Sequence, residues 1–456
     1  MRDEKELNVK RSFVFTSVAA LLLGSTIYTP AQESFAPESL RSKGRVVIPE
    51  NAIEHPGDVG VRAHQPLRIF VPADRAEFGG DPNSYALPEA AATFAVGPPF
   101  PNTGFNTPAS LACQYHIVTP TAGCNPNTFK TNPSSGSKAI GLVEAFDDPT
   151  AMADLNTYST QFGLPLVTAA TFKTFFAGGV GGCAGPDPGG DPTGGAELET
   201  SLDLDMIHAM APKAKIIVVF AHSLALSDLL TAEDCAGKQV AAAGGGEISN
   251  SWGGSEFSGE TSLDTHFVKA GIVYFASTGD TAGTQWPSVS PNVVAVGGTT
   301  LGRVNSGPNL GNFFFEATWE DGGGGVSQFE PRPAYQSPLP ASTHKRVPDV
   351  SADANPNTGV WVFDHNPVLG SGWFTVGGTS AAAPLWAGIV NAAGHFATSS
   401  IAELTTIYNA YNTPASYAAD YNDITLGFCG FFDGTLAATK YDLCTGVGSP
   451  KGTGGK

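Results

Sequence analysis

Apolar runs and helical periods alternate along the chain from about residue 138 onward. Four short apolar runs predict buried strands: 139–143, 214–220, 247–251 and 271–276. Three segments have the spacing of helices: 152–162, 198–210 and 263–269. Buried strands that alternate with helices predict an α/β fold in which one parallel sheet is flanked by helices.

The residues before this region follow a different pattern. Residues 32–137 are rich in Pro, Asn and Gly, and Pro98, Pro99, Pro101, Pro108 and Pro120 interrupt any long element. We expect an N-terminal extension or a reduced pro-segment with some strand content, and a single catalytic domain over residues 138–456.

The first 31 residues have the pattern of an export signal. Lys10 and Arg11 precede an apolar run over 13–27, after which Thr29 and Ala31 provide small residues for a cleavage site. This predicts a signal peptide over residues 1–31 and a secreted protein. The apolar run is shorter than a membrane-spanning helix requires, so we expect no membrane anchor.

Composition narrows the possible partners. The chain has 42 acidic and 24 basic residues, a formal charge of −18, and only 14% charged residues. A basic surface is what nucleic-acid binding requires, so this balance argues against it. The small number of cations also limits charge repulsion in acid, which makes the composition compatible with acid tolerance.

The six cysteines are compatible with disulfides in an oxidising compartment. Fifteen pairings of six cysteines exist, and we favour the sequential pairs Cys113–Cys124, Cys183–Cys235 and Cys429–Cys444. The sequence contains no Cys-x-x-Cys spacing, so a zinc site or a redox dithiol is not expected.

The strongest chemical signal is the run Gly-Gly-Thr-Ser-Ala-Ala-Ala-Pro over 377–384. Two glycines allow a sharp turn, so that Ser380 can lie exposed where a helix begins. The amides at the start of that helix are suited to hold an oxyanion. The alternative is an ordinary glycine-rich helix start.

A serine nucleophile needs a base. No His-Gly-Thr-His type segment is present, and His208 lies within a predicted helix, where a packed or solvated role is expected. Glu199 and Asp203 are four residues apart and share one helix face. Such a pair can share a proton and act as a base in acid. The alternative is a solvated acidic face that also includes Glu197 and Asp205.

A third carboxyl group follows an apolar strand. Asp280, in Thr-Gly-Asp, comes directly after the strand that ends near residue 276. Functional groups gather at the carboxyl ends of parallel strands, and a protonated carboxyl there can donate a hydrogen bond to an oxyanion. The alternative is a loop aspartate that forms a turn or caps a helix.

These motifs, in this order over residues 138–450, resemble the sedolisin or serine-carboxyl peptidase family. The segments Ser251-Trp252-Gly253-Gly254, Val-Gly-Gly-Thr at 296–299 and Pro-Asp-Val-Ser at 348–351 also look like segments of that family. The register of Glu199 and Asp203 against Ala-Pro at 211–212 excludes Glu197 and Asp205 from the matching positions.

The resemblance implies a subtilisin-like fold and roles for four residues. Ser380 is the nucleophile, Glu199 the general base, Asp203 its orienting partner, and Asp280 the oxyanion donor. Residues matching Glu144 and Trp252 extend the hydrogen-bond chain behind Asp203 in some members.

A calcium site is also implied by the resemblance. The expected ligands of one structural Ca²⁺ are Asp423, Ile424, Ala438, Lys440 and Asp442. Carboxylates and backbone carbonyls are hard oxygen ligands of the kind that calcium prefers. Ala438 and Lys440 stand where the family generally has glycine, and a Cys429–Cys444 bridge would brace this loop.

The expected function is therefore a secreted, monomeric endopeptidase that hydrolyses proteins or peptides at acid pH through an acyl-enzyme. The region before residue 138 is short for the folded prodomain that this family usually carries. The competing hypothesis is a catalytically inactive peptidase scaffold that binds proteins. An esterase is less compatible, since Ser380 is not in a Gly-x-Ser-x-Gly elbow.

Overall fold

The computed structural model describes residues 43–73, 81, 83–89, 96–430 and 435–456. The chain divides into a unit Met1–Phe35 and a second unit Ala36–Lys456, and the description that follows concerns the second. The expected signal peptide over residues 1–31 lies outside the described residues. Within the described part, no helix combines the length and apolar character needed to cross a membrane.

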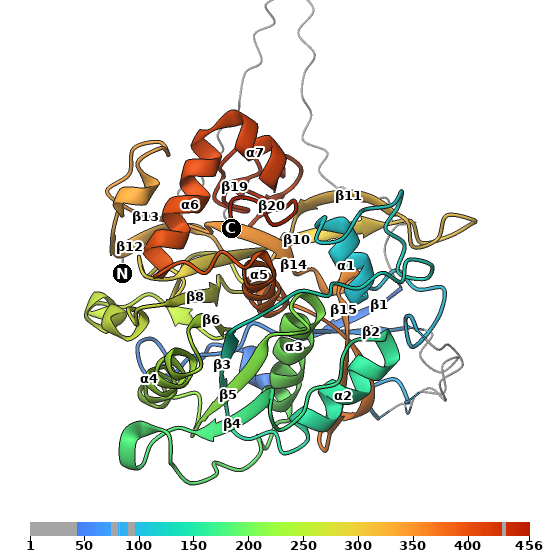
Figure 1. Ribbon diagram of the computed structural model, residues 1–456, viewed down its shortest axis with the longest axis horizontal. Coiled ribbons are helices and arrows are strands. Elements are labelled where there is room, and N and C mark those ends of the chain that lie inside the picture. The colour runs from blue at the N-terminus through green and yellow to red at the C-terminus, as the bar shows by residue number, and fades with distance from the viewer. Residues whose placement is uncertain (1–42, 74–80, 82, 90–95, 431–434) are drawn as a thin grey trace, which may run out of the picture. The chain divides into compact units, whose positions relative to one another are not determined.

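A mixed sheet of mainly parallel strands forms the centre of the described unit (Figure 1). Its strand order is β11-β10-β8-β6-β3-β5-β4, and β14 also pairs with β10. All neighbours are parallel except β11, which is antiparallel to β10. The strands are β3 (Ala139–Ala145), β4 (Phe172–Phe176), β5 (Lys215–Ala221), β6 (Gly246–Asn250), β8 (Ile272–Ser277), β10 (Val294–Arg303), β11 (Phe313–Thr318) and β14 (Val350–Asp353).

Helices cover both faces of this sheet, as the sequence predicts (Figure 1). On β3, Ile140 and Leu142 point into the core that contains α3 and α5. Ala139 and Val143 point into the other core, with α4. The α-helices are α1 (Pro108–Gln114), α2 (Ala151–Phe162), α3 (Gly195–Met210), α4 (Leu226–Ala242), α5 (Thr379–Ala393), α6 (Ser400–Asn412) and α7 (Pro414–Asp420). The predicted helix over 263–269 is a 3₁₀ helix, Glu260–Phe267.

The chain before residue 138, here called the N-terminal segment, takes part in a second sheet of the same unit. This antiparallel sheet has the order β1-β2-β16-β15, so strands from before residue 138 pair with strands from the C-terminal half. Its strands are β1 (Gly44–Val47), β2 (Arg68–Pro72), β15 (Val360–Asn366) and β16 (Gly370–Gly377). All residues of β2 are buried, which shows that this part of the extension packs as core.

Two- to seven-residue strands form the smaller sheets. They are β7 (Gly254–Ser255) with β9 (Gln285–Trp286), β12 (Gly325–Pro331) with β13 (His344–Val347), β17 (Tyr421–Asn422) with β20 (Ser449–Pro450), and β18 (Phe428–Cys429) with β19 (Thr435–Leu436). Short 3₁₀ helices occur at Glu50–Ala52, Val180–Gly182, Ala334–Gln336 and Pro356–Thr358.

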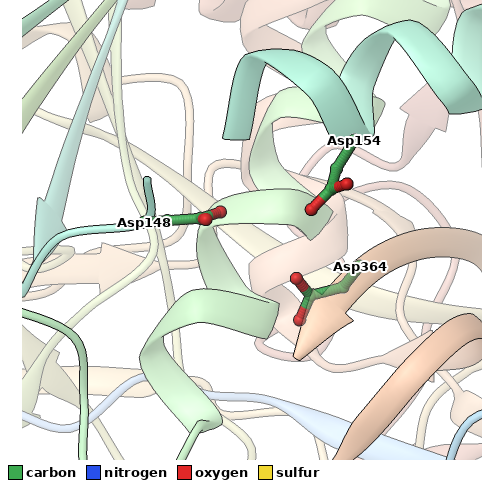
Figure 2. Close-up of side chains that lie close together, drawn as sticks. All are labelled: Asp148, Asp154 and Asp364. Atoms are coloured by element: carbon green, nitrogen blue, oxygen red, sulfur yellow. The ribbon is translucent and has the colours of Figure 1, made fainter. Parts of the chain in front are cut away.

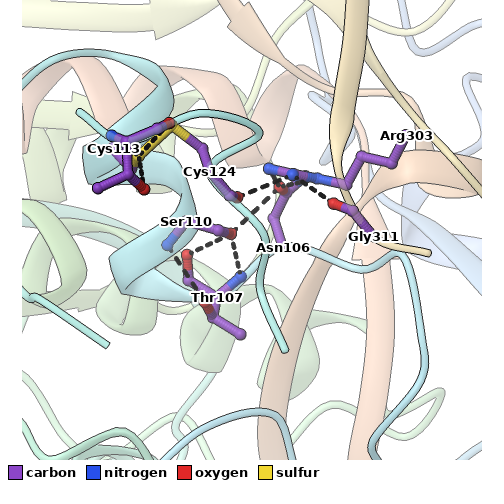
Figure 3. The surroundings of a disulfide bond; sticks show 8 residues. Asn106, Thr107, Ser110, Cys113, Cys124, Arg303 and Gly311 are labelled. Atoms are coloured by element: carbon purple, nitrogen blue, oxygen red, sulfur yellow. Dashed lines mark hydrogen bonds between the residues drawn. A yellow bond between two sulfur atoms is a disulfide. The ribbon is translucent and has the colours of Figure 1, made fainter. Parts of the chain in front are cut away.

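The three disulfides join the cysteines in sequential order: Cys113–Cys124, Cys183–Cys235 and Cys429–Cys444. The structure therefore has the predicted pairing. Around the first bridge, the buried guanidinium of Arg303 on β10 donates to Asn106 Oδ1 (3.0 and 2.7 Å) and to the carbonyl of Cys124 (2.9 Å) (Figure 3). These bonds anchor the segment around α1 to the central sheet.

Candidate active site

The carboxyl ends of three adjacent parallel strands bring polar groups together. Glu144 lies near the end of β3, Ser251 follows β6, and Asp280 follows β8. All three residues are buried, although each comes from a loop or strand end. Crevices at this edge of an α/β sheet are the usual location of functional groups.

Ser380 lies in the first turn of α5, directly after the end of β16. Gly378 has φ of 111°, and a Cβ there would lie 2.8 Å from Asp280 Oδ2, so glycine is required at this turn. Pro384 lies inside α5 and has no N–H to donate to the carbonyl of Ser380 four residues earlier. The proline in the motif thus leaves that carbonyl free for another partner.

Ser251 links the nucleophile to one of the two acidic residues on α3. Its hydroxyl lies 2.9 Å from Asp203 Oδ1, to which it donates, and 3.3 Å from the freed carbonyl oxygen of Ser380. The sequence motifs predict no role for Ser251. Its place directly before Trp252 in the Ser-Trp-Gly-Gly segment is the one feature of the sequence that could indicate a residue near the site.

Glu199 and Asp203 are completely buried on α3, so the solvated acidic face considered from the sequence does not form. Burial raises the pKa of Glu199 well above its ordinary value, and the charge of Asp203 raises it further. Ser380 lies close enough to lower the pKa of Glu199, but within the described residues neither Ser380 Oγ nor the two carboxyl oxygens of Glu199 make a hydrogen bond. Burial raises the pKa of Asp203 to about 8, and the hydrogen bond from Ser251 opposes the rise.

A polar chain continues behind Asp203 into the N-terminal segment. Burial, followed by the charges of Asp203 and Glu199, raises the pKa of Glu144 well above its ordinary value. The side-chain amide of Gln65 donates to Glu144 Oε2 (3.3 Å), and Asn51 Nδ2 donates to Gln65 Oε1 (2.9 Å). Three buried carboxyl groups side by side cannot all ionise cheaply, so this chain holds protons.

Trp252 and His208 are buried, but neither belongs to the polar chain behind Asp203. Trp252 packs against Trp286 (ring centroids 6.2 Å apart), and its indole N–H makes no hydrogen bond within the described residues. His208 is buried in α3, where Nε2 lies 2.7 Å from the carbonyl oxygen of Pro165. Burial lowers the pKa of His208.

Asp280 is held against the first turn of α5. Its Oδ1 accepts hydrogen bonds from the amide (2.8 Å) and the hydroxyl (2.9 Å) of Thr379. Arg68 of the N-terminal segment places Nη1 3.6 Å from Asp280 Oδ2 and donates from Nη2 to the Asp280 carbonyl (3.0 Å). Burial raises the pKa of Asp280 to about 6, although the arginine and Thr379 oppose the rise.

The backbone of the N-terminal segment crosses this site. His64 exchanges two backbone hydrogen bonds with Gly253 (2.8 and 3.0 Å) in an antiparallel bridge. Two residues later, the carbonyl oxygen of Pro66 accepts a hydrogen bond from the amide of Ser380 (3.4 Å). The Pro66–Leu67 peptide bond therefore lies against the nucleophile, and the segment makes contacts of the kind that an extended peptide makes in a cleft.

The residues expected to bind calcium come from two segments that meet through amide hydrogen bonds. Both carboxylate oxygens of Asp423 accept from the Lys440 amide (2.8 and 2.9 Å), and Asp442 Oδ2 accepts from the Ala438 amide (3.0 Å). Ile424 is buried beside Asp423. The Lys440 ammonium lies over the ring of Tyr411, 5.6 Å from its centroid. Two carboxylates at one short backbone segment are a donor set that fits a hard cation.

A buried serine at the start of a central helix, facing the carboxyl edge of a parallel sheet, defines the subtilisin-like class of fold. In agreement, a family model described as "Subtilase family" matches residues 180–398. The structure of Pseudomonas sedolisin, a serine-carboxyl proteinase complexed with two molecules of pseudo-iodotyrostatin, superimposes with a TM-score of 0.61 at 23% identity. It covers 76% of this chain and 96% of that one.

Curated relatives match part of the chain. Kumamolisin of Bacillus sp. (strain MN-32) is 32% identical over 303 residues, which is 58% of this chain and 51% of the relative. Sedolisin of Pseudomonas sp. (strain 101) is 31% identical over 183 residues, 38% of this chain and 29% of the relative. The chain is similar to members of the sedolisin family over part of its length: it spans about half the length of kumamolisin and less than a third of sedolisin.

Proposed function

We propose that this chain is a serine-carboxyl endopeptidase that cuts proteins at acid pH. The observation that carries the proposal is the arrangement of Ser380 at the start of α5 beside a buried, proton-holding pair on α3, with Asp280 held at the same turn. Histidine would be protonated in acid and would fail as a base. The Glu199–Asp203 pair would instead titrate in two steps and, while it shares one proton, would keep one negative charge that can accept the proton of the serine.

In the proposed reaction, Ser380 Oγ attacks the scissile carbonyl and its proton passes to Glu199. Asp203, which accepts from Ser251 (2.9 Å), orients Glu199 and shares the proton. The amide of Ser380 and the protonated carboxyl of Asp280 donate to the oxyanion. Glu199 then returns the proton to the leaving amine, and water hydrolyses the acyl-enzyme by the reverse sequence.

Cleavage of a denatured protein substrate at pH 4 and at pH 7 tests this proposal. Asp280 donates only when protonated, and its pKa is raised to about 6. We expect activity at pH 4 and a fall of roughly tenfold per unit above pH 6 as Asp280 ionises. A folded, processed chain that cuts nothing at pH 4 would instead support the inactive binding scaffold. Activity that rises toward pH 7 would contradict the role of Asp280.

The N-terminal segment is proposed to be a reduced pro-segment that blocks the cleft before activation. The carbonyl oxygen of Pro66 accepts the hydrogen bond from the amide of Ser380 that the oxyanion would need. Arg68 pairs with Asp280, the carboxyl group expected to donate to the oxyanion. Above pH 6 an ionised Asp280 holds Arg68, whereas protonation in acid removes the ion pair and weakens the hold of the segment.

An Arg68→Gln variant is therefore expected to lose its N-terminal segment at higher pH than the wild type. The measurement is the intact mass and the new N-terminus after incubation at pH 4, 5, 6 and 7. Arg62→Gln is the matched control, because Arg62 is an exposed arginine of the same segment. Equal processing profiles for wild type and Arg68→Gln would exclude a role for the ion pair.

We infer the location and the metal content from the resemblance to this family. Three disulfides favour an oxidising compartment, and we infer a secreted, monomeric peptidase that acts on proteins or peptides. Asp423 and Asp442, with backbone oxygens at Ile424, Ala438 and Lys440, would hold one structural Ca²⁺. When bound, the ion would stabilise the loop that is also closed by Cys429–Cys444.

A further inference from the structure

Three buried aspartates from separate elements converge away from the catalytic serine. Asp148 follows β3, Asp154 lies in the first turn of α2, and Asp364 belongs to β15. One carboxylate oxygen of each lies within 4.8 Å of the others. Figure 2 shows the three carboxylates turned toward one another from different parts of the chain.

Neutral donors orient these carboxylates. The amide and the hydroxyl of Thr150 both donate to Asp148 Oδ1 (2.9 Å each), and the same hydroxyl lies 2.7 Å from Asp154 Oδ2. Asn366 donates to Asp364 Oδ2 (2.9 Å). Asp154 Oδ1 also forms an ion pair with His365 Nδ1 when that imidazole is protonated, and within the described residues no lysine or arginine pairs with the three aspartates. The one paired group, His365, therefore offsets only part of the negative charge of the three carboxylates.

An unused acceptor points into the cluster. Asp148 is 4% exposed, and its Oδ2 has no hydrogen-bond partner within the described residues. The side chain is directed toward Asp154 and Asp364 (Figure 2). Leaving a buried carboxylate oxygen without a partner is costly unless a proton or a cation satisfies it.

The neighbouring helix α3 adds further negative charge. Asp205 Oδ1 and Glu197 Oε2 are also buried without a partner in the described part of the chain. Helix α3 packs against both α2 and β15, so these two carboxyl groups add negative charge beside the cluster.

We propose that Asp148, Asp154 and Asp364 bind a calcium ion at a site separate from the Asp423–Asp442 loop. Calcium takes six to eight oxygen ligands at about 2.3–2.6 Å, so oxygens up to about twice that distance apart can contact one ion. The spread of 4.8 Å meets this condition. A donor set of oxygen alone favours a hard cation over zinc or copper.

The ion would stabilise the element that carries the catalytic acids. Ser201 of α3 donates to Asp364 Oδ1 (3.5 Å), and Asp205 of the same helix accepts from the amide of Phe363 on β15 (3.3 Å). A bound cation would therefore join α2 and β15 beside the helix on which Glu199 and Asp203 lie.

Calcium binding to the full chain tests the proposal. The Ser380→Ala background prevents self-digestion, and titration calorimetry in chelator-treated buffer at pH 7.5 keeps the carboxylates available for metal. We expect Asp364→Asn to lower the number of bound Ca²⁺ ions by one, and Asp423→Asn to act independently on the other site. Asp234→Asn, which changes a half-exposed aspartate paired with His266, is the matched control.

The proposal is overturned if Asp364→Asn folds and binds as many ions as its parent, or if Asp423→Asn alone abolishes all binding. It is also overturned if Asp364→Asn raises the melting temperature without calcium while leaving the calcium stoichiometry unchanged, since the aspartates then only share protons. If Asp364→Asn does not fold, Asp148→Asn provides the same comparison, because it changes the carboxylate with the free oxygen. These readouts do not depend on peptidase activity, so they stand apart from the proposed function.

Discussion

Replacing Ser380 by alanine is expected to lower kcat for protein cleavage at pH 4 by a factor of about 10⁴–10⁶. The variant removes the only atom in the proposed site that forms the covalent acyl-enzyme. Ser380 is fully buried and its hydroxyl makes no hydrogen bond within the described residues, so alanine, which keeps the Cβ, changes little packing. The measurement is steady-state cleavage of a denatured protein by the wild type and the variant, prepared and incubated in the same way.

Matched variants separate loss of chemistry from loss of structure. Ser159→Ala removes another buried hydroxyl, on α2, and is expected to keep near-normal kcat. Glu199→Gln keeps the shape of the side chain but cannot accept the proton, so a loss comparable to that of Ser380→Ala is expected. Glu233→Gln, a buried acid of α4, is its control. Activity retained in Ser380→Ala would show that another residue is the nucleophile.

The chain is expected to be most stable near pH 4 and to lose stability as the pH rises toward 8. Burial raises the pKa of Asp148 to about 6, of Glu316 to about 7, and of Asp203 and Glu247 to about 8. The unfolded values lie near 4. Each group binds its proton more tightly in the folded chain, so its contribution is complete below pH 4 and is lost as the pH rises through the folded pKa.

The size of this effect follows from the shifts. One pKa unit corresponds to about 1.4 kcal/mol. If each of the four carboxyl groups contributes only about 1 kcal/mol, the free energy of unfolding falls by about 4 kcal/mol between pH 4 and pH 8. This is a large share of the roughly 5–15 kcal/mol that stabilises most proteins. The chain has 24 lysines and arginines, which limits the opposing repulsion in acid.

Thermal melts of the Ser380→Ala chain from pH 4 to pH 8, in chelator, measure the effect. Glu247 accepts from Asn391 (2.7 Å), an interaction that glutamine can keep through its carbonyl oxygen. Glu247→Gln is therefore expected to reduce the pH dependence and to raise the melting temperature at pH 8. A melting temperature that increases from pH 4 to pH 8 would contradict the assignment of these groups as proton-holding.

Much of the catalytic unit was predictable because its signals are local. The apolar run 139–143 and the helical period over 198–210 reflect burial on both faces of a parallel sheet, and they correspond to β3 and α3. The motif around Ser380 encodes a turn and a helix start within eight residues. The cysteines pair in sequential order, and two of the three bridges join cysteines only 11 and 15 residues apart.

The tertiary structure alone decided which distant residues meet. β2 pairs with β16 about 300 residues away, and only that pairing places Pro66 and Arg68 against Ser380 and Asp280. A proline-rich segment has no period that reports such a partner. The convergence of Asp148, Asp154 and Asp364 likewise depends on how β3, α2 and β15 pack. Sequence patterns record which side of an element is buried, whereas long-range contacts are selected by the packing of whole elements.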